Sequence, residues 1–471
     1  MSSRGEKLVK NTAVLSLGTF LPKLAVMITL PILTGCLTKA EYGTYDLIVN
    51  LVSLILPAAT LQIQTAAFRF LIDVRGKEKE VKSIITNIFV FIVPTSIIAL
   101  IIMFFCLYSL SFVMRIWICV YFFADILAQA VRQVARGLND NLGYSISAIV
   151  NGVGKIVFDV ILVMFFSAGL EGAVVALAIS STASFVFLVI KSKLYRYIDL
   201  KCVSKAELKE LLKYSWPMVP NSMSMWVVNL SDRFVITSVM GVAANAVYSA
   251  ATKIPQMLTV AQSTFTMAWQ ESASIASKDD DADAYYSSMF KVVFNVMAGF
   301  MGLLIGFTPL LFMILIRGDY DEAYNQIPIL FMGMFFYSLS AYLGGIYVAQ
   351  KATKSVGITT IVAAICNLAI NISLIHWIGL YAGSISTLVS YVVLYVYRMI
   401  NLRKSVKMKY DHKYMIAIII GLGVMCFLCF QRNFILNCVN CVIGIAAFCV
   451  LNRGLIKAML KKAKKMLSKK K

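Results

Sequence analysis

Charged and polar side chains recur at helical spacing inside several apolar segments of the chain, and these residues could bind a polar substrate. Charge at bilayer depth is unfavourable, so it usually faces a protein interior or a water-filled cavity. We expect four basic residues to face an anionic substrate in such a cavity: Lys23, Arg233, Lys253 and Lys155. We expect five more residues to line the cavity or to take part in ion coupling: Asp125, Asp159, Asp232, Asn229 and Gln256.

The balance between these charges bears on the class of substrate. A cation or drug exporter is expected to place carboxylates at the centre of the membrane. A carrier of a diphosphate or an acidic sugar is expected to place Lys and Arg there, because both form charge-assisted hydrogen bonds to phosphate. The excess of basic residues favours an anionic substrate. Two alternatives remain open: Lys155 and Asp159 could neutralise one another at their i, i+4 spacing, and Asp232 and Arg233 could be structural ties.

Two motifs imitate chemical sites. Cys426-x-x-Cys429 and Cys438-x-x-Cys441 lie within apolar segments, where we expect the cysteines to pack as small hydrophobic residues, with an outward disulfide as the alternative. Asp279, Asp280, Asp281 and Asp283 form an acidic cluster that we interpret as a solvated loop. No phosphate-binding loop, zinc-protease motif or nucleophile elbow is present. We therefore expect a protein that is not an enzyme and needs no cofactor or metal.

The composition indicates the elements that hold these residues. The 471 residues are 60% hydrophobic and only 14% charged, whereas a soluble chain holds about 25% charged residues. Apolar segments of about 20 residues or more predict transmembrane helices, since lipid requires every backbone polar group to be paired internally. We expect about fourteen spans, at residues 12–35, 45–69, 84–108, 112–134, 145–168, 170–190, 212–240, 243–270, 288–316, 326–350, 356–376, 378–400, 414–431 and 434–452.

The distribution of Lys and Arg predicts the orientation. Of the 44 basic residues, all but eight fall at the two termini, in connections on one side of the predicted membrane, or within a few residues of the span ends on that side. The exceptions are four in the opposite loops (Lys39, Arg115, Arg317 and Arg432) and the four cavity candidates. Basic residues concentrate on the cytoplasmic side of membrane proteins. We therefore expect both termini in the cytoplasm. This topology accounts for the net charge of +21 without nucleic-acid binding.

The predicted spans suggest an all-α polytopic protein of two six-helix bundles with two further helices. The N-terminal bundle is expected at 1–190, a cytoplasmic connection at 191–211 and the C-terminal bundle at 212–404. The two additional helices are expected at 405–452 and a basic cytoplasmic tail at 453–471. Paired six-helix repeats are a transporter architecture with the substrate between the halves.

Short sequence patterns in the first, seventh and eighth predicted spans resemble a known family. They are Lys10-Asn11, Pro31-Ile32-Leu33-Thr34, Glu41-Tyr42-Gly43-Thr44-Tyr45-Asp46, Tyr214-Ser215-Trp216-Pro217, Pro220-Asn221-Ser222, Ser231-Asp232-Arg233, Tyr248 and Lys253-Ile254-Pro255. The chain is similar in these patterns to the polysaccharide repeat-unit flippases, within the multidrug, oligosaccharidyl-lipid and polysaccharide exporter superfamily.

The resemblance implies alternating access and a polyprenyl-diphosphate-linked oligosaccharide as substrate, in a bacterial cytoplasmic membrane. It also implies that Lys23, Arg233 and Lys253 face the anionic part of the substrate, with Lys155 a less secure fourth. Membrane lipids, a polysaccharide polymerase and glycosyltransferases are the expected partners. The alternatives are a cation-coupled multidrug exporter of the same superfamily and, from a different class, a membrane polysaccharide polymerase or ligase.

Overall fold

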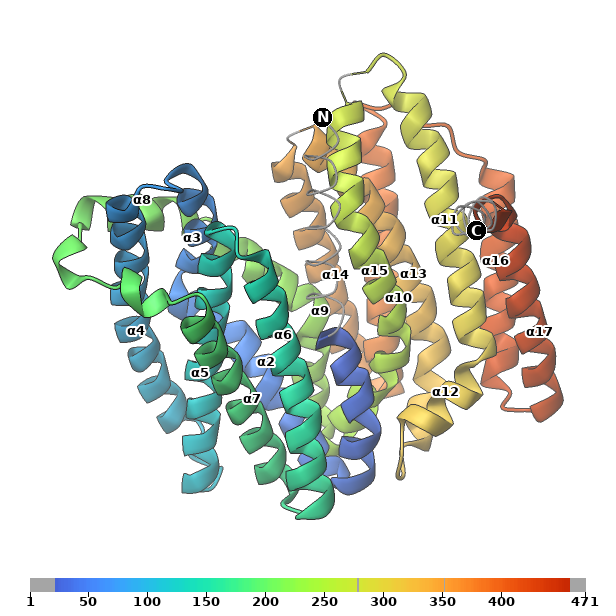
Figure 1. Cartoon of the computed structure of the whole chain (residues 1–471). Coiled ribbons are helices and arrows are strands. Elements are labelled where there is room, and N and C mark those ends of the chain that lie inside the picture. Colours follow the sequence, from blue (N-terminus) through green and yellow to red (C-terminus); the bar gives the residue numbers. More distant parts are fainter. Residues whose placement is uncertain (1–21, 278, 351, 458–471) are drawn as a thin grey trace, which may run out of the picture. The chain divides into compact units, whose positions relative to one another are not determined.

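A computed structural model describes residues 22–457, except residues 278 and 351 (Figure 1). All regular elements in this range are helical. The principal helices are α2 (Lys39–Thr60), α3 (Ile63–Asp73), α4 (Glu78–Cys106), α5 (Phe112–Gly137), α6 (Asn141–Phe158), α7 (Gly169–Lys191), α8 (Lys205–Ser215), α9 (Met218–Met240), α10 (Val242–Ala276), α11 (Ala282–Gly306), α12 (Thr308–Leu315), α13 (Asp321–Ala349), α14 (Thr353–Ile378), α15 (Tyr381–Leu402), α16 (His412–Phe430) and α17 (Phe434–Leu451).

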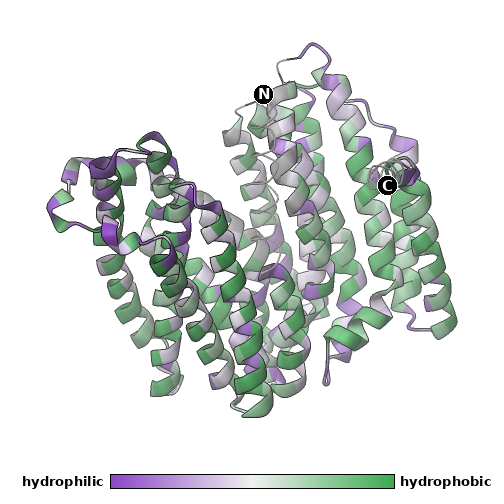
Figure 2. Ribbon diagram, viewed as in Figure 1, coloured by the Kyte–Doolittle hydropathy of each residue, from purple (hydrophilic) through white to green (hydrophobic). Residues whose placement is uncertain are grey.

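The fold confirms an all-α polytopic membrane protein. Eleven of the described helices are long and apolar enough to cross a membrane, and Figure 2 shows hydrophobic residues along the helices and hydrophilic ones at many of their ends. A shorter apolar helix spans Pro22–Cys36. The helices α9 and α10 contain 23 and 35 residues. Both carry polar residues singled out from the sequence, which lower their hydropathy and leave them outside the eleven.

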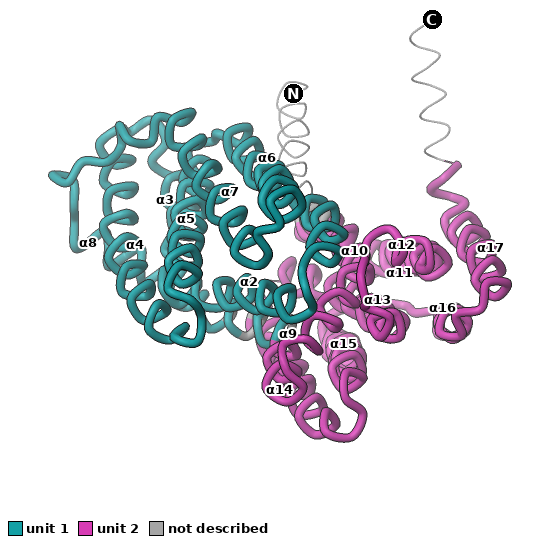
Figure 3. Tube along the Cα trace, turned by 90° about the horizontal axis from the view of Figure 1, so that it is seen from below, with its two compact units in different colours: residues 1–230 teal, residues 231–471 magenta. Residues whose placement is uncertain are grey.

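The chain forms two compact units, residues 1–230 and 231–471, coloured separately in Figure 3. The boundary falls within α9, so the last turns of this helix belong to the second unit. The division into bundles at 191–211 and 405–452, which the sequence suggests, stays a prediction. So does the separate tail at 453–471, most of which lies outside the described residues.

The first unit contains a break in an expected span. The sequence predicts one helix over residues 45–69, but α2 ends and α3 begins on either side of Leu61 and Gln62. Both residues have left-handed backbone conformations, with φ of 46° and 55°. Residues other than glycine rarely adopt this backbone conformation, and it interrupts the ladder of helical hydrogen bonds. Pro57 within α2 already lacks one backbone donor upstream of the break.

A π-helix follows α6 in the first unit. The element η1 (Asp159–Phe165) continues directly from α6, and the amide of Phe166 donates to the carbonyl of Ile161 at 3.0 Å, five residues back. Such widened turns are uncommon and occur frequently at functional sites. The first residue of η1 is Asp159, one of the residues singled out from the sequence.

The second unit is held by close helix contacts. Two glycines of α11, Gly302 and Gly306, face α17. A Cβ on Gly306 would lie 2.9 Å from the carbonyl oxygen of Asn440, and one on Gly444 of α17 would lie 2.5 Å from the carbonyl oxygen of Gly302. Small residues at helix interfaces allow this approach in membranes. The expected span at 288–316 is divided into α11 and the short α12, with Phe307 between them.

Candidate functional site

The most developed polar cluster of the second unit surrounds Asp232, near the end of α9. This carboxylate is only 3% exposed. Its Oδ2 accepts hydrogen bonds from Tyr248 Oη of α10 at 3.1 Å and from Thr387 Oγ1 of α15 at 2.7 Å. Its Oδ1 accepts from Asn371 Nδ2 of α14 at 2.8 Å, with Ser386 Oγ at 3.4 Å. Asp232 therefore ties α9 to three other helices.

The chemistry of these donors is specific. An ionised carboxylate only accepts hydrogen bonds, and every partner named here donates one. All four are neutral, and within the described part of the chain no Lys, Arg or His forms an ion pair with Asp232. A buried charge with neutral partners is strongly disfavoured. The cluster is suited to an ion-coupling role, because a proton or a small cation would neutralise the charge.

The neighbouring Arg233 is also buried, with 3% exposure. Its Nη2 donates to Thr252 Oγ1 of α10 at 3.1 Å. Lys253 follows Thr252 and is half-buried, as is Gln256 one turn later. The structure thus places Arg233 at the contact of α9 with α10, within one unit, and Lys253 is the residue next to its acceptor Thr252.

In the first unit, the ion pair that the i, i+4 spacing left open as an alternative is present. Lys155 Nζ donates to Asp159 Oδ2 and, at 3.2 Å, to Thr29 Oγ1. The ammonium also lies 5.5 Å from the ring centroid of Tyr45. Lys155 is 8% exposed and Asp159 is fully buried. Asp159 Oδ1 has no hydrogen-bond partner among the described residues, so the pair leaves one acceptor available.

The other candidates are more dispersed. Asp125 on α5 is half-buried and accepts from Gln129 Nε2 at 2.8 Å. Lys23 lies exposed on the helix Pro22–Cys36. The side chain of Asn229 lies outside the described residues, so its assignment to the cavity stays a prediction. The anion-binding roles of Lys23, Arg233, Lys253 and Lys155 also stay predictions.

Sequence reasoning missed a buried guanidinium in the second unit. Arg398 on α15 is 6% exposed. Its Nη1 donates to the Ser340 carbonyl at 2.7 Å, Nε to Thr359 Oγ1 at 3.1 Å and Nη2 to Thr360 Oγ1 at 3.1 Å. All three acceptors are neutral, and they belong to α13 and α14. Arg398 falls near the end of a predicted span, where a basic residue is usually assigned to the headgroup region.

The partners of Asp232 were missed as well. Asn371 bonds Asp232, and Asn367, one turn before it, bonds Ser231 and Ser386. Their spacing of four residues in a largely apolar helix is the signal in the sequence that indicates a polar face. Ser386 and Thr387 carried a weaker signal, because hydroxyl side chains in membrane helices often bond their own backbone. The hydroxyl of Ser386 lies near Asp232 Oδ1 and also 2.9 Å from the backbone carbonyl of Gly383 in its own helix.

The cysteine pairs and the acidic cluster are both interpreted from the sequence as structural features. Cys426 and Cys429 are buried, and Cys426 Sγ lies 3.4 Å from the Pro328 carbonyl. Cys438 is exposed, and every cysteine in the described range is a free thiol. In the acidic cluster, Asp283 Oδ2 accepts from the amide of Lys407 at 3.1 Å. Among the described residues no group of three His, Cys, Asp or Glu side chains is arranged to hold a metal.

Comparisons with known proteins agree with this architecture. A family model described as polysaccharide biosynthesis protein matches residues 8–270, more than half of the chain. A solved structure of the lipid II flippase MurJ in an inward closed conformation has a TM-score of 0.70 at 14% identity, covering 95% of this chain and 100% of that one. An inward-facing multidrug resistance MATE family transporter of the MOP superfamily has a TM-score of 0.69 at 16% identity, covering 82% and 96%.

A third structure, a MOP superfamily transporter from Pyrococcus furiosus, has a TM-score of 0.60 at 16% identity and covers 84% of this chain and 95% of that one. At these identities the likeness shows a shared fold. A search of curated proteins finds no match.

Proposed function

We propose that this chain, which belongs to the polysaccharide biosynthesis protein family, is a flippase for a polyprenyl-diphosphate-linked oligosaccharide. It would carry this repeat unit across a bacterial cytoplasmic membrane by alternating access, for surface polysaccharide synthesis. The observation that carries the proposal is the family match over residues 8–270 in a chain with the fold of the MurJ and MATE structures.

Basic residues within the membrane-spanning helices support an anionic substrate. A diphosphate cannot enter a low-dielectric cavity without counter-charge, because desolvating an unpaired ion costs several kcal/mol. We assign this counter-charge to Lys23, Arg233 and Lys253, with Lys155 as a weaker candidate. Arg233 has the best support, since it is buried about two turns before the end of α9 and its guanidinium is oriented by Thr252. Arginine can also grip a phosphate through two parallel hydrogen bonds.

We further propose that both termini lie in the cytoplasm, as the basic residues indicate. A polyprenyl-linked sugar is assembled by glycosyltransferases and consumed by a polymerase, so these are the proposed partners. Translocation of this kind makes and breaks no bond in the substrate. The chain would act as a transporter and not as an enzyme.

Asp232 is the proposed coupling residue. A buried carboxylate with only neutral partners among the described residues gains most from a proton or a monovalent cation. Its donors come from α10, α14 and α15, so neutralising it would change the contacts that hold four helices. The half-buried Asp125 and the buried Asp159 are secondary candidates.

The same carboxylate favours a second candidate function, cation-coupled export of a drug. Such an exporter requires carboxylates without cationic partners, and Asp232 has only neutral partners among the residues that the structure describes. The two functions differ in the charge of the substrate. They therefore make opposite predictions for the basic residues, which only the flippase requires.

The experiment is export of the polysaccharide in cells that lack the native gene. Lys23→Ala and Arg233→Ala should each remove a charge-assisted contact of about 1.5–3 kcal/mol, a loss of roughly tenfold to a hundredfold in substrate affinity. Arg233→Lys distinguishes a need for charge from a need for a two-pronged contact. Lys209→Ala, on the exposed face of α8, is the matched control. Wild-type export by both alanine variants, at normal membrane levels, would reject the anion-binding role.

A further inference from the structure

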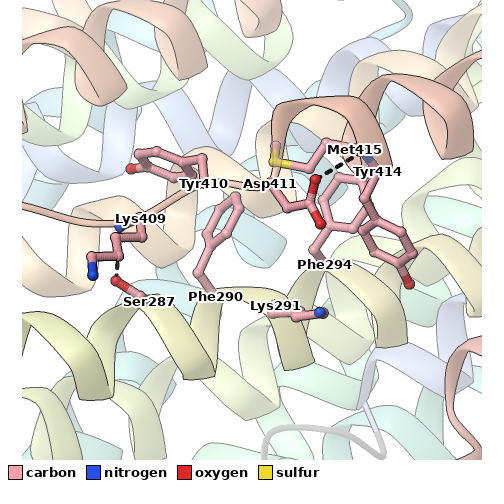
Figure 4. Close-up of a pocket in the computed structure, with 9 residues that line it drawn as sticks. All are labelled: Ser287, Phe290, Lys291, Phe294, Lys409, Tyr410, Asp411, Tyr414 and Met415. Carbon is pink, nitrogen blue, oxygen red and sulfur yellow. Dashed lines mark hydrogen bonds between the residues drawn. The ribbon is translucent and has the colours of Figure 1, made fainter.

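A pocket of about 320 Å³ lies in the second unit, away from the Asp232 cluster. It opens where α11 and α16 begin, beside the connection that joins α15 to α16 (residues 403–411). The lining residues are Ser287, Phe290, Lys291, Phe294, Lys409, Tyr410, Asp411, Tyr414 and Met415 (Figure 4). One water occupies about 30 Å³ of liquid, so the pocket has room for a compact polar group and not for a folded partner.

The connection is fixed against α11 by its backbone. The amide of Lys407 donates to Asp283 Oδ2 at 3.1 Å, and the amide of Lys409 donates to Ser287 Oγ at 2.9 Å. The two acceptors stand one turn apart on α11. Asp411 then caps α16 by accepting from the amide of Tyr414 at 3.2 Å. These bonds hold the pocket in shape and leave the side chain of Lys409 available.

Aromatic rings form the walls. Phe290 meets the ring of Tyr410 edge-on, with centroids 5.1 Å apart, and Figure 4 shows Phe290 pointing from α11 toward that ring. Tyr414 donates to Asn295 Oδ1 at 2.9 Å. Burial raises the pKa of Tyr410 to about 12, so its hydroxyl remains protonated at neutral pH. Tyrosines with one apolar and one wet end are typical of the membrane–water interface.

The rim is basic. Lys291 and Lys409 are exposed at the pocket, and Lys291 Nζ lies 5.3 Å from the ring centroid of Tyr414. Four more basic residues are exposed on the same connection and the first turn of α16: Arg403, Lys404, Lys407 and Lys413. The nearby carboxylates of Asp283 and Asp411 both accept backbone hydrogen bonds. Six exposed basic residues outnumber these two carboxylates, so the net charge of the groups named here is positive.

We propose that this pocket binds the phosphodiester head group of an anionic phospholipid from the leaflet that the basic residues assign to the cytoplasm. Lys291 and Lys409 hold the phosphate, and the hydroxyl of Tyr410 faces the glycerol part. Basic pockets between membrane helices on that side suit such head groups. The Tyr410 hydroxyl also donates to Met408 Sδ at 3.5 Å, a contact that the glycerol part would replace or share. The acyl chains have lipid-facing surface beside the pocket, because Ile416 and Ile420 of α16 are exposed. The proposal is independent of the transported substrate.

The test is lipid binding to the purified, delipidated full chain, measured by native mass spectrometry. Dioleoyl phosphatidylglycerol, with its net negative head group, should bind at least about tenfold more tightly than dioleoyl phosphatidylethanolamine. Lys291→Gln with Lys409→Gln should remove most of that preference. The matched control is Lys404→Gln with Lys413→Gln, which removes the same charge from outside the pocket and should change affinity less than about twofold. Lys291→Arg with Lys409→Arg should retain binding.

Three results would overturn the proposal. Equal losses in the two glutamine pairs would indicate diffuse surface attraction and no pocket. Equal binding of the two phospholipids would show that the anionic head group is not recognised. Binding of a polyprenyl phosphate without binding of phosphatidylglycerol would assign the pocket to a different lipid.

Discussion

Lys155 and Asp159 form a buried ion pair across the junction of α6 and the π-helix η1. The pair is supported by Thr29 and by the ring of Tyr45. Removing one partner of a buried pair leaves an uncompensated charge, at a cost of about 3–5 kcal/mol. Lys155→Met and Asp159→Asn should each lower the thermal stability of the purified protein markedly. The double variant should recover most of the loss. Equal stability of the two single variants and the wild type would contradict a structural role for the pair.

Asp232 gives a prediction that separates coupling from folding. Asp232→Asn keeps the size of the side chain but can neither carry a charge nor take up a proton. We expect transport to fall by at least about tenfold while the protein still purifies as a single folded species. Thr387→Val, which removes the 2.7 Å donor, should weaken transport less. Full activity of Asp232→Asn at every pH tested would exclude this carboxylate as the coupling site.

Arg398 provides a test of a residue that the sequence did not reveal. Its three hydrogen bonds join α15 to α13 and α14, and bonds from a charged group contribute about 1.5–3 kcal/mol each. Arg398→Lys keeps the charge but loses the planar arrangement of donors. Both Arg398→Lys and Arg398→Gln should lower the unfolding temperature of the purified protein. A glutamine variant with lowered stability but a lysine variant like the wild type would show that charge alone is sufficient.

The contacts of Asp140 lead us to expect that its contribution to stability is lost at low pH. It lies before α6, where it accepts from Ser192 Oγ at 2.6 Å, from the amide of Gly143 at 2.8 Å and from Lys191 Nζ at 3.1 Å. Burial by itself raises the pKa of Asp140, but these contacts together outweigh it, and its pKa lies below the ordinary value of 3.8.

A carboxyl group whose pKa is lower in the folded than in the unfolded protein stabilises the fold at pH values above its unfolded-state pKa. This contribution is lost as the pH falls through the folded-state pKa. Asp140→Asn should therefore be less stable than the wild type at neutral pH. The difference should shrink as the pH is lowered below about 4. Thermal unfolding at a series of pH values measures this. A difference that stays constant with pH would show that the charge of Asp140 is not involved.

The spacing of residues along the sequence indicates features that lie within a single helix. The pairing of Lys155 with Asp159 follows from four residues of separation, and the helical class follows from the long apolar segments. The environment of Asp232 depends on α14 and α15, well over a hundred residues later, and one sequence does not indicate which helix faces meet. No role was predicted for Arg398, because a basic residue one turn from the end of a helix usually reaches the headgroup region. Three neutral acceptors instead hold its guanidinium inside the protein.

The break at Leu61 and Gln62 could not be predicted, since neither residue is glycine or proline. Both residues nevertheless adopt a left-handed backbone conformation, which side chains such as these rarely do.

The central claim is that the protein moves an anionic, lipid-linked oligosaccharide. The most direct measurement uses the purified full chain in proteoliposomes that contain a fluorescent polyprenyl-diphosphate-linked sugar. A membrane-impermeant quencher reports the fraction exposed on the outer leaflet over time. The account predicts that exposure is faster than in empty liposomes and is slowed about tenfold or more by Arg233→Ala. Exposure no faster than in empty liposomes, together with movement of a cationic dye that Arg233→Ala leaves unchanged, would contradict it.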